Sequence, residues 1–280
     1  MQFDSNRAWN DALAAVTANR EVLLALGGVF FLLPTLLSTV FLTDVQAQIL
    51  EALQKPQLVN RVIADNIGLL AGFGIGGTLV QLLGYLAVTA LISERGRPTV
   101  GESIGWGLRA VPSLFAVLVI GFLGLMLATT VFSAVVVGLF AVLGAPGAGS
   151  VLAVVLLMLG LAYVSVKLSL VVPVIVNEGL AGPVLAMARS WKLTKGNSLR
   201  LFGFYTLLSL GYFVIALMST FLVVGPVMLV LGQGKVAVLV MGLVSGAIGA
   251  AASVLFAAVL SKAHSQLAGP SAGVQADLFE

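Results

Sequence analysis

Residues 112–142 read PSLFAVLVIGFLGLMLATTVFSAVVVGLFAV and contain no charged residue. A helix that crosses the hydrocarbon core of a bilayer needs about 20 apolar residues, because the core is about 30 Å thick and the helix rises about 1.5 Å per residue. This stretch exceeds that length. We therefore expect a membrane-spanning helix that tilts, kinks or extends beyond the bilayer.

Five further runs have the same apolar character, and they lie roughly at 22–42, 67–92, 151–176, 199–231 and 236–261. The 280-residue chain is 60% hydrophobic and only 9% charged, whereas about a quarter of the residues in a soluble domain are charged. This composition excludes a water-soluble globular domain, and it is too apolar for a disordered chain. It predicts an all-α, polytopic integral membrane protein with about six transmembrane helices.

The chain lacks the residues that most metal and redox chemistry requires. It has no cysteine and one histidine, His264, which excludes disulfides, thiolate metal sites and cysteine nucleophiles. A metal-dependent hydrolase draws two or more ligands from histidines and carboxylates, and the acidic residues here are scattered. No span contains a paired nucleophile and base. We expect no metal site, no cofactor and no enzymatic activity.

The basic residues fall unevenly on the two sides of the predicted spans. One set of span ends carries ten of them and the other carries three: Arg7, Arg20, Arg95, Arg97, Arg109, Arg189, Lys192, Lys195, Arg200 and Lys262 against Lys55, Arg61 and Lys235. The positive-inside rule predicts that the richer side, with both termini, is cytoplasmic. We expect a multi-pass protein of the cytoplasmic (inner) membrane whose partners are anionic phospholipids rather than nucleic acid.

The connections between spans carry turn signals. The sequence GAPGAGS at 144–150 predicts a turn, and Gly225–Pro226 predicts a break in the fifth run. The connection 43–66 is expected on the opposite side, with a short amphipathic helix that carries Val45, Ile49 and Leu53. Residues 263–280 are expected to form a flexible cytoplasmic tail, in which His264 is solvated.

Each of the three tryptophans lies in a short, half-polar segment before a pair of spans on the basic side. Trp9 lies in 5–19, Trp106 in 99–110 and Trp191 in 183–195; the second segment opens with a capping box, Thr99 to Glu102. We interpret the segments as three cytoplasmic interfacial amphipathic helices. The alternative is unrelated loops, since tryptophan and arginine gather at interfaces in any case. A single membrane domain, 1–262, then has units of about 1–92, 98–176 and 182–262.

Small residues at four-residue spacing let helix backbones approach closely in lipid. Two spans have this pattern, at Gly68, Gly72 and Gly76 and at Gly242 and Gly246. These glycines predict packing faces, either within the chain or against a partner chain, which includes a homo-oligomer.

Lys167 is the ionisable residue deepest within a span. It either snorkels to the interface or forms an intramembrane polar site with Glu178, which is placed eleven residues later. The cluster Arg189, Lys192, Lys195 and Arg200 is the densest positive charge. It is either a topology signal alone or a site for a lipid headgroup or a partner, together with Trp9, Trp106 and Trp191. Glu178 and Arg189 could pair across the turn between them.

Residues 173–202 read PVIVNEGLAGPVLAMARSWKLTKGNSLRLF. This stretch resembles the signature of the glycerophosphoryl diester phosphodiesterase membrane-domain family and the YciC-like inner-membrane proteins. The matching positions are Pro173, Glu178, Gly182, Pro183, Arg189, Ser190, Trp191, Lys195, Gly196 and Arg200. The resemblance implies a polytopic membrane module without the soluble phosphodiesterase domain, for which the chain has neither the histidines nor a long enough soluble stretch.

Taken together, the sequence predicts a non-enzymatic module of the cytoplasmic membrane. It is expected to engage anionic lipids or a membrane protein partner and to support envelope or lipid homeostasis. The alternative is a transporter or channel for a small molecule or lipid with its site near Lys167, because repeats and proline-interrupted spans are typical of transporters.

Overall fold

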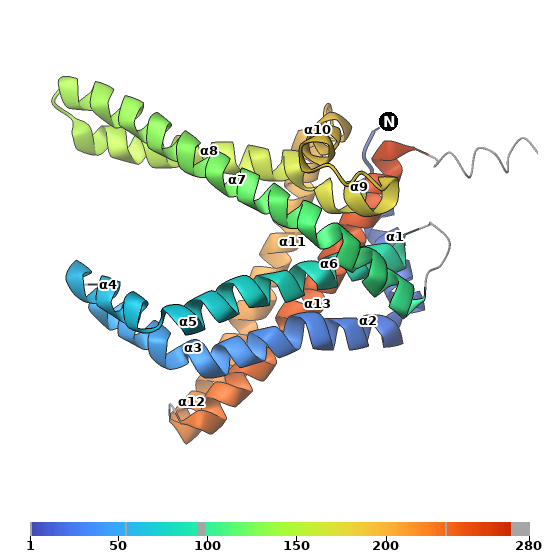
Figure 1. The fold of residues 1–280 in the computed structure, drawn as a ribbon, viewed down its shortest axis with the longest axis horizontal. Helices are drawn as coiled ribbons and strands as arrows, with labels where there is room; N and C mark the ends of the chain where they lie inside the picture. Colours follow the sequence, from blue (N-terminus) through green and yellow to red (C-terminus); the bar gives the residue numbers. More distant parts are fainter. Residues whose placement is uncertain (1, 54, 94–98, 233, 270–280) are drawn as a thin grey trace, which may run out of the picture.

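The computed structural model describes all residues except 1, 54, 94–98, 233 and 270–280. The described residues are helical and include no strand. Six helices are long and apolar enough to cross a membrane, as predicted: Arg20–Ala52, Ile67–Ile92, Val100–Val142, Gly147–Glu178, Ser198–Leu231 and Lys235–Ala268. Successive helices pair as antiparallel hairpins (Figure 1).

The first hairpin rises through three helical segments and returns through three more. It consists of α2 (Arg20–Gly27), the π-helical η1 (Gly28–Leu32), α3 (Leu33–Ala52), α5 (Ile67–Ala71), the π-helical η2 (Gly72–Gly76) and α6 (Gly77–Ile92). The connection holds α4 (Pro56–Asp65), which begins at a proline, a residue suited to the first turn of a helix. The helix predicted around Val45 and Ile49 was wrong, because these residues continue α3 without a break.

The second hairpin is formed by α7 (Val100–Val142) and α8 (Pro146–Leu168), followed by the short α9 (Val171–Glu178). The predicted capping box is confirmed at the start of α7, where Thr99 and Glu102 cap each other. The segment 99–110 is not a separate interfacial helix, however, because α7 continues for 43 residues. That length corresponds to about 64 Å, about twice the thickness of the hydrocarbon core.

The third hairpin follows α10 (Pro183–Leu193). It consists of α11 (Ser198–Ser219), the π-helical η3 (Thr220–Val224), α12 (Gly225–Leu231) and the long α13 (Lys235–Ala268). The span continues through Gly225–Pro226 rather than breaking there, since Pro226 lies in the first turn of α12. Residues 263–268, predicted as flexible tail, form the end of α13, and 270–280 lie outside the described residues.

The core lies at one end of the bundle, where α1 (Ser5–Ala18) packs against α13 and the two chain ends meet (Figure 1). Its buried apolar residues come from all three hairpins and α1, and include Phe3, Ala8, Leu23, Val88, Leu201 and Val259. By contrast, α7 and α8 project away from the other helices (Figure 1), and none of the most apolar stretch of α11 and its continuation is buried. These surfaces would be covered by lipid in a membrane.

The two glycine patterns differ in what they contact. A Cβ on Gly246 would lie 3.2 Å from the carbonyl oxygen of Leu32, and one on Gly242 would lie 2.9 Å from the Leu36 side chain. These glycines let α13 approach the first span closely. Nothing lies within 4 Å of the same position on Gly68, Gly72 or Gly76. That second pattern therefore forms no packing face within this chain.

Candidate functional site

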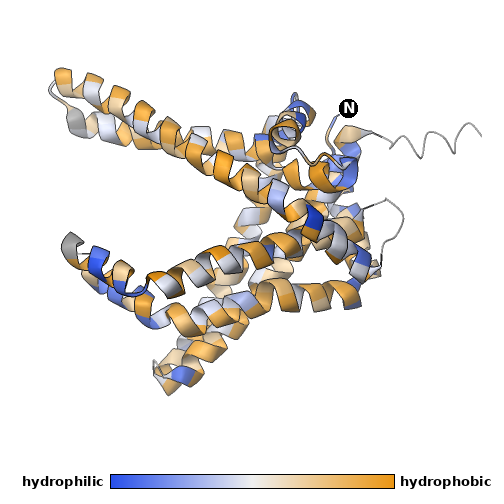
Figure 2. Cartoon of the chain, viewed as in Figure 1, coloured by the Kyte–Doolittle hydropathy of each residue, from blue (hydrophilic) through white to orange (hydrophobic). Residues whose placement is uncertain are grey.

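The described basic residues of the richer set gather at the end of the bundle that holds both chain ends. They lie on α1, α2, α7, α10, α11, α13 and the turn after α10: Arg7, Arg20, Arg109, Arg189, Lys192, Lys195, Arg200 and Lys262. Arg95 and Arg97 lie outside the described residues. Figure 2 shows hydrophilic residues concentrated at this end, with the hairpins largely hydrophobic along their length. We call this region the basic end.

A polar network around Glu178 ties three helices together at the basic end. The carboxylate of Glu178, the last residue of α9, accepts from Nε of Arg189 on α10 with distances of 3.1 and 2.8 Å. Its Oε1 also lies 3.0 Å from Nε2 of His264 on α13. The pairing of Glu178 with Arg189, proposed from the sequence, is confirmed. A fork of this kind orients the guanidinium as well as attracting it.

The turn between α9 and α10 makes this pairing possible. Gly179 has a left-handed φ of 69°, which glycine adopts without the steric cost that a side chain would bring. Pro183 then starts α10 at the position where a missing N–H is harmless. The chain reverses within a few residues, and Arg189 comes back beside the end of α9.

His264 does not lie in a solvated tail, as the sequence suggested, but is buried at 4% exposure in α13. Asn177 Nδ2 lies 3.4 Å from its Nδ1. A neutral imidazole with its proton on Nε2 satisfies both contacts, because it donates to Glu178 and accepts from the Asn177 amide. The tail prediction failed because helix α13 continues past the apolar run and packs its last turns against α1 and α9.

Lys167, in the last turn of α8, is buried at 4% exposure rather than snorkelling. Its Nζ lies 5.5 Å from the centre of the Tyr163 ring and 5.6 Å from that of Trp191. The two rings meet edge to face at 5.8 Å. Both distances are within the range of a cation–π interaction. Lys167 therefore joins α8 to α10, and Glu178 is not its partner.

Ser190 closes the gap between α8 and α9 from the opposite helix. Its buried hydroxyl donates to the carbonyl oxygen of Lys167 at 2.7 Å and accepts from the N–H of Leu170 at 3.2 Å. Backbone groups at helix ends need such partners when they are buried. The Arg189–Ser190–Trp191 sequence thus makes three successive contacts that seat α10 on the bundle.

The N-terminal segment is held by side chains of the last hairpin. The N–H of Phe3 donates to Asn197 Oδ1 at 2.9 Å, and that of Asp4 donates to Gln266 Oε1 at 3.2 Å. Asp4 in turn caps α1 through the N–H of Arg7. These bonds place α1, with Trp9, against α11 and α13.

The three tryptophans do not form one site. Trp9 lies beside α11 and α13, Trp106 is 40% exposed on α7, and Trp191 is 42% exposed over Lys167. The basic cluster also divides in two. Arg189 is engaged by Glu178, whereas Lys192, Lys195 and Arg200 are exposed and have no carboxylate partner among the described residues.

Sequence reasoning missed Ser190, Asn197 and Asn177 as structural contacts, and it misplaced His264. Polar residues next to an apolar span carried a signal, because such groups need partners where water is absent. The described residues contain no cluster of three or more histidine or acidic side chains that could hold a metal ion.

No known protein family, curated protein or solved structure matches this chain. The resemblance of residues 173–202 to the phosphodiesterase membrane-domain family therefore stays an expectation.

Proposed function

We propose that this chain is a non-enzymatic membrane module that binds anionic phospholipids at its basic end and supports lipid or envelope homeostasis. The observation that carries the proposal is the exposed trio Lys192, Lys195 and Arg200, which lies at the same end as the tryptophans and has no acidic partner among the described residues. Each basic residue near an anionic leaflet contributes about 1 kcal/mol of attraction.

The same asymmetry supports a cytoplasmic orientation of the basic end, and with it both termini. In that orientation α1 and α10 lie at headgroup level, where tryptophan rings are favoured. The proposal includes the family resemblance as the origin of the architecture, without phosphodiesterase activity.

Transport remains the second candidate and rests on the burial of Lys167. The contacts of Lys167 weaken it, because this side chain lies under two aromatic rings and does not line the groove between α11 and α13. Loss of substrate uptake in Lys167→Met, with the fold intact, would favour transport over the proposed module.

The proposal is tested with the full chain in vesicles of phosphatidylcholine that contain spin-labelled phosphatidylglycerol or spin-labelled phosphatidylcholine. The motionally restricted fraction of each label gives the lipid preference of the protein surface. We expect a preference for phosphatidylglycerol that falls about fivefold in Lys192→Gln/Lys195→Gln, as the loss of about 1 kcal/mol predicts. The matched control Lys55→Gln/Arg61→Gln, at the opposite end, should keep it. Equal restriction of both labels by the unmodified chain would refute the proposal.

A further inference from the structure

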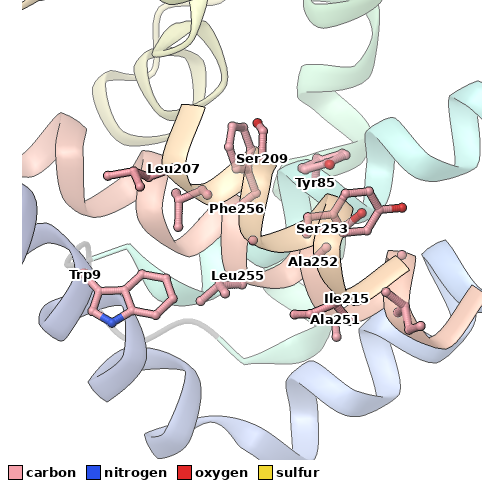
Figure 3. A pocket seen from close by; sticks show the side chains of 15 residues that line it. Trp9, Tyr85, Leu207, Ser209, Ile215, Ala251, Ala252, Ser253, Leu255 and Phe256 are labelled. Atoms are coloured by element: carbon pink, nitrogen blue, oxygen red, sulfur yellow. The ribbon is translucent and has the colours of Figure 1, made fainter. Parts of the chain in front are cut away.

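An apolar groove of about 680 Å³ lies between α11 and α13. Trp9 of α1 and Tyr85 of α6 also line it, and Figure 3 shows these side chains around the facing surfaces of the two long helices. The volume is within the range of about 300–1,000 Å³ that is typical of small-molecule sites.

Small residues keep the groove open. Gly211 on α11 and Gly249 on α13 line it, and a Cβ on either glycine would have nothing within 4 Å. The neighbouring face of α13 is different, because Gly246 there is closed by Leu32 of the first span. Helix α13 thus packs tightly on one side and leaves a hollow on the other.

The surroundings of the groove favour a hydrocarbon chain as its occupant. Its lining has no charged residue and is apolar apart from a few hydroxyls, those of Tyr85, Ser209, Tyr212 and Ser253. The most apolar stretch of the span that begins at Ser198 is wholly unburied, so the groove lies beside lipid in a membrane. An apolar hollow that faces the bilayer interior is filled by acyl chains, since neither water nor polar ligands are stable there.

The end of the groove nearest the basic end fits an anionic headgroup. Arg200, Leu207, Gly211 and Ile215 lie on one face of α11 by their spacing, and Arg200 precedes Leu207 by about 10 Å along the helix axis. Arg200 is exposed, and a guanidinium pairs with phosphate through two hydrogen bonds. Trp9 lies beside the groove on α1, and tryptophan is favoured at headgroup depth.

We propose that this groove binds one phospholipid with an anionic headgroup, with acyl chain between α11 and α13 and its phosphate at Arg200. This inference rests on the proposed function and adds to it a defined site, distinct from the diffuse attraction of Lys192 and Lys195. The site holds one lipid long enough to survive removal of the surrounding bilayer.

The test is native mass spectrometry of the full chain released from nanodiscs of equal parts phosphatidylglycerol and phosphatidylcholine. We expect one phosphatidylglycerol to remain bound at collision energies that remove the other lipids. Gly249→Phe fills the groove without a clash at its Cβ, and it should lower this retained fraction at least fivefold. Gly72→Phe, at a position equally open but on the first hairpin, is the matched control and should leave it unchanged. Arg200→Gln should abolish the preference for phosphatidylglycerol.

Three results would overturn the inference. They are equal retention by Gly249→Phe and Gly72→Phe, retention of phosphatidylcholine as readily as phosphatidylglycerol by the unmodified chain, and a dimer that Gly249→Phe disrupts, which would mean that a second copy fills the groove. Lys192→Gln/Lys195→Gln separates the two proposals. Loss of the spin-label preference with the single lipid retained supports both, whereas a retained lipid without any spin-label preference in the unmodified chain refutes the proposed function alone.

Discussion

Replacing Glu178 by alanine should destabilise the fold more than other single changes to exposed charges, because it removes one carboxylate from two partners. The bonds lost are the fork from Arg189 and the contact with His264. A hydrogen bond to a charged group contributes about 1.5–3 kcal/mol, and a buried polar group left without a partner costs about 1–3 kcal/mol.

The exposure of each partner decides where in these ranges the loss falls. The His264 side chain is 5% exposed, so water cannot replace its lost partner, whereas Arg189 at 35% can turn to solvent. We therefore take the low end for arginine and the middle for histidine. The expected loss in the free energy of unfolding is about 3 kcal/mol.

The loss can be measured by titrating sodium dodecyl sulfate into detergent micelles and following the fluorescence of the three tryptophans. Arg61→Gln is the matched control. It breaks the exposed pair with Asp65, whose atoms are 4.0 Å apart with side chains 81% and 69% exposed, and should cost less than about 0.5 kcal/mol. A loss for Glu178→Ala no larger than that of the control would refute the reasoning that the network stabilises the basic end.

Three further predictions concern packing, the buried lysine and orientation. Gly246→Leu should lower the free energy of unfolding by about 1–3 kcal/mol through overpacking against the first span, while Gly72→Leu in open space should change it by less than about 0.5 kcal/mol; equal effects in the same titration would contradict this. Lys167→Met keeps most of the buried volume but loses both cation–π contacts, so it should cost about 0.5–2 kcal/mol and shift the tryptophan emission; an unchanged spectrum would count against the contact. Because the chain has no cysteine, single substitutions Ser5→Cys and Ala145→Cys can be labelled with an impermeant maleimide in intact cells; we expect labelling of Ala145→Cys alone, and the reverse pattern would invert the orientation.

The spans could be predicted from the sequence because their signal is local. Residues 112–142 announce a membrane helix by length and lack of charge alone, and the structure has helix there. The capping box of Thr99 and Glu102 could be predicted for the same reason, since both partners lie within one turn. Such features depend on neighbours along the chain rather than on the way that helices meet.

The polar contacts at the basic end could be predicted only in part. Glu178 and Arg189 are close in sequence, so their pairing could be anticipated, but His264 comes from a helix 86 positions away. Nothing in the tail sequence indicates that α13 continues and packs against α1. Likewise, Gly72 and Gly246 share one pattern, and only the arrangement of helices shows that one is packed and the other open.

The length of α7 has a mechanical consequence. The uncharged run 112–142 alone measures about 46 Å, and to fit within about 30 Å of hydrocarbon it must lean by about 50°. Because this hairpin projects away from the other helices (Figure 1), it can change its inclination without disturbing the core. We expect it to stand more upright among long lipid tails and to lie flatter among short ones, so that membrane thickness sets the posture of the protein.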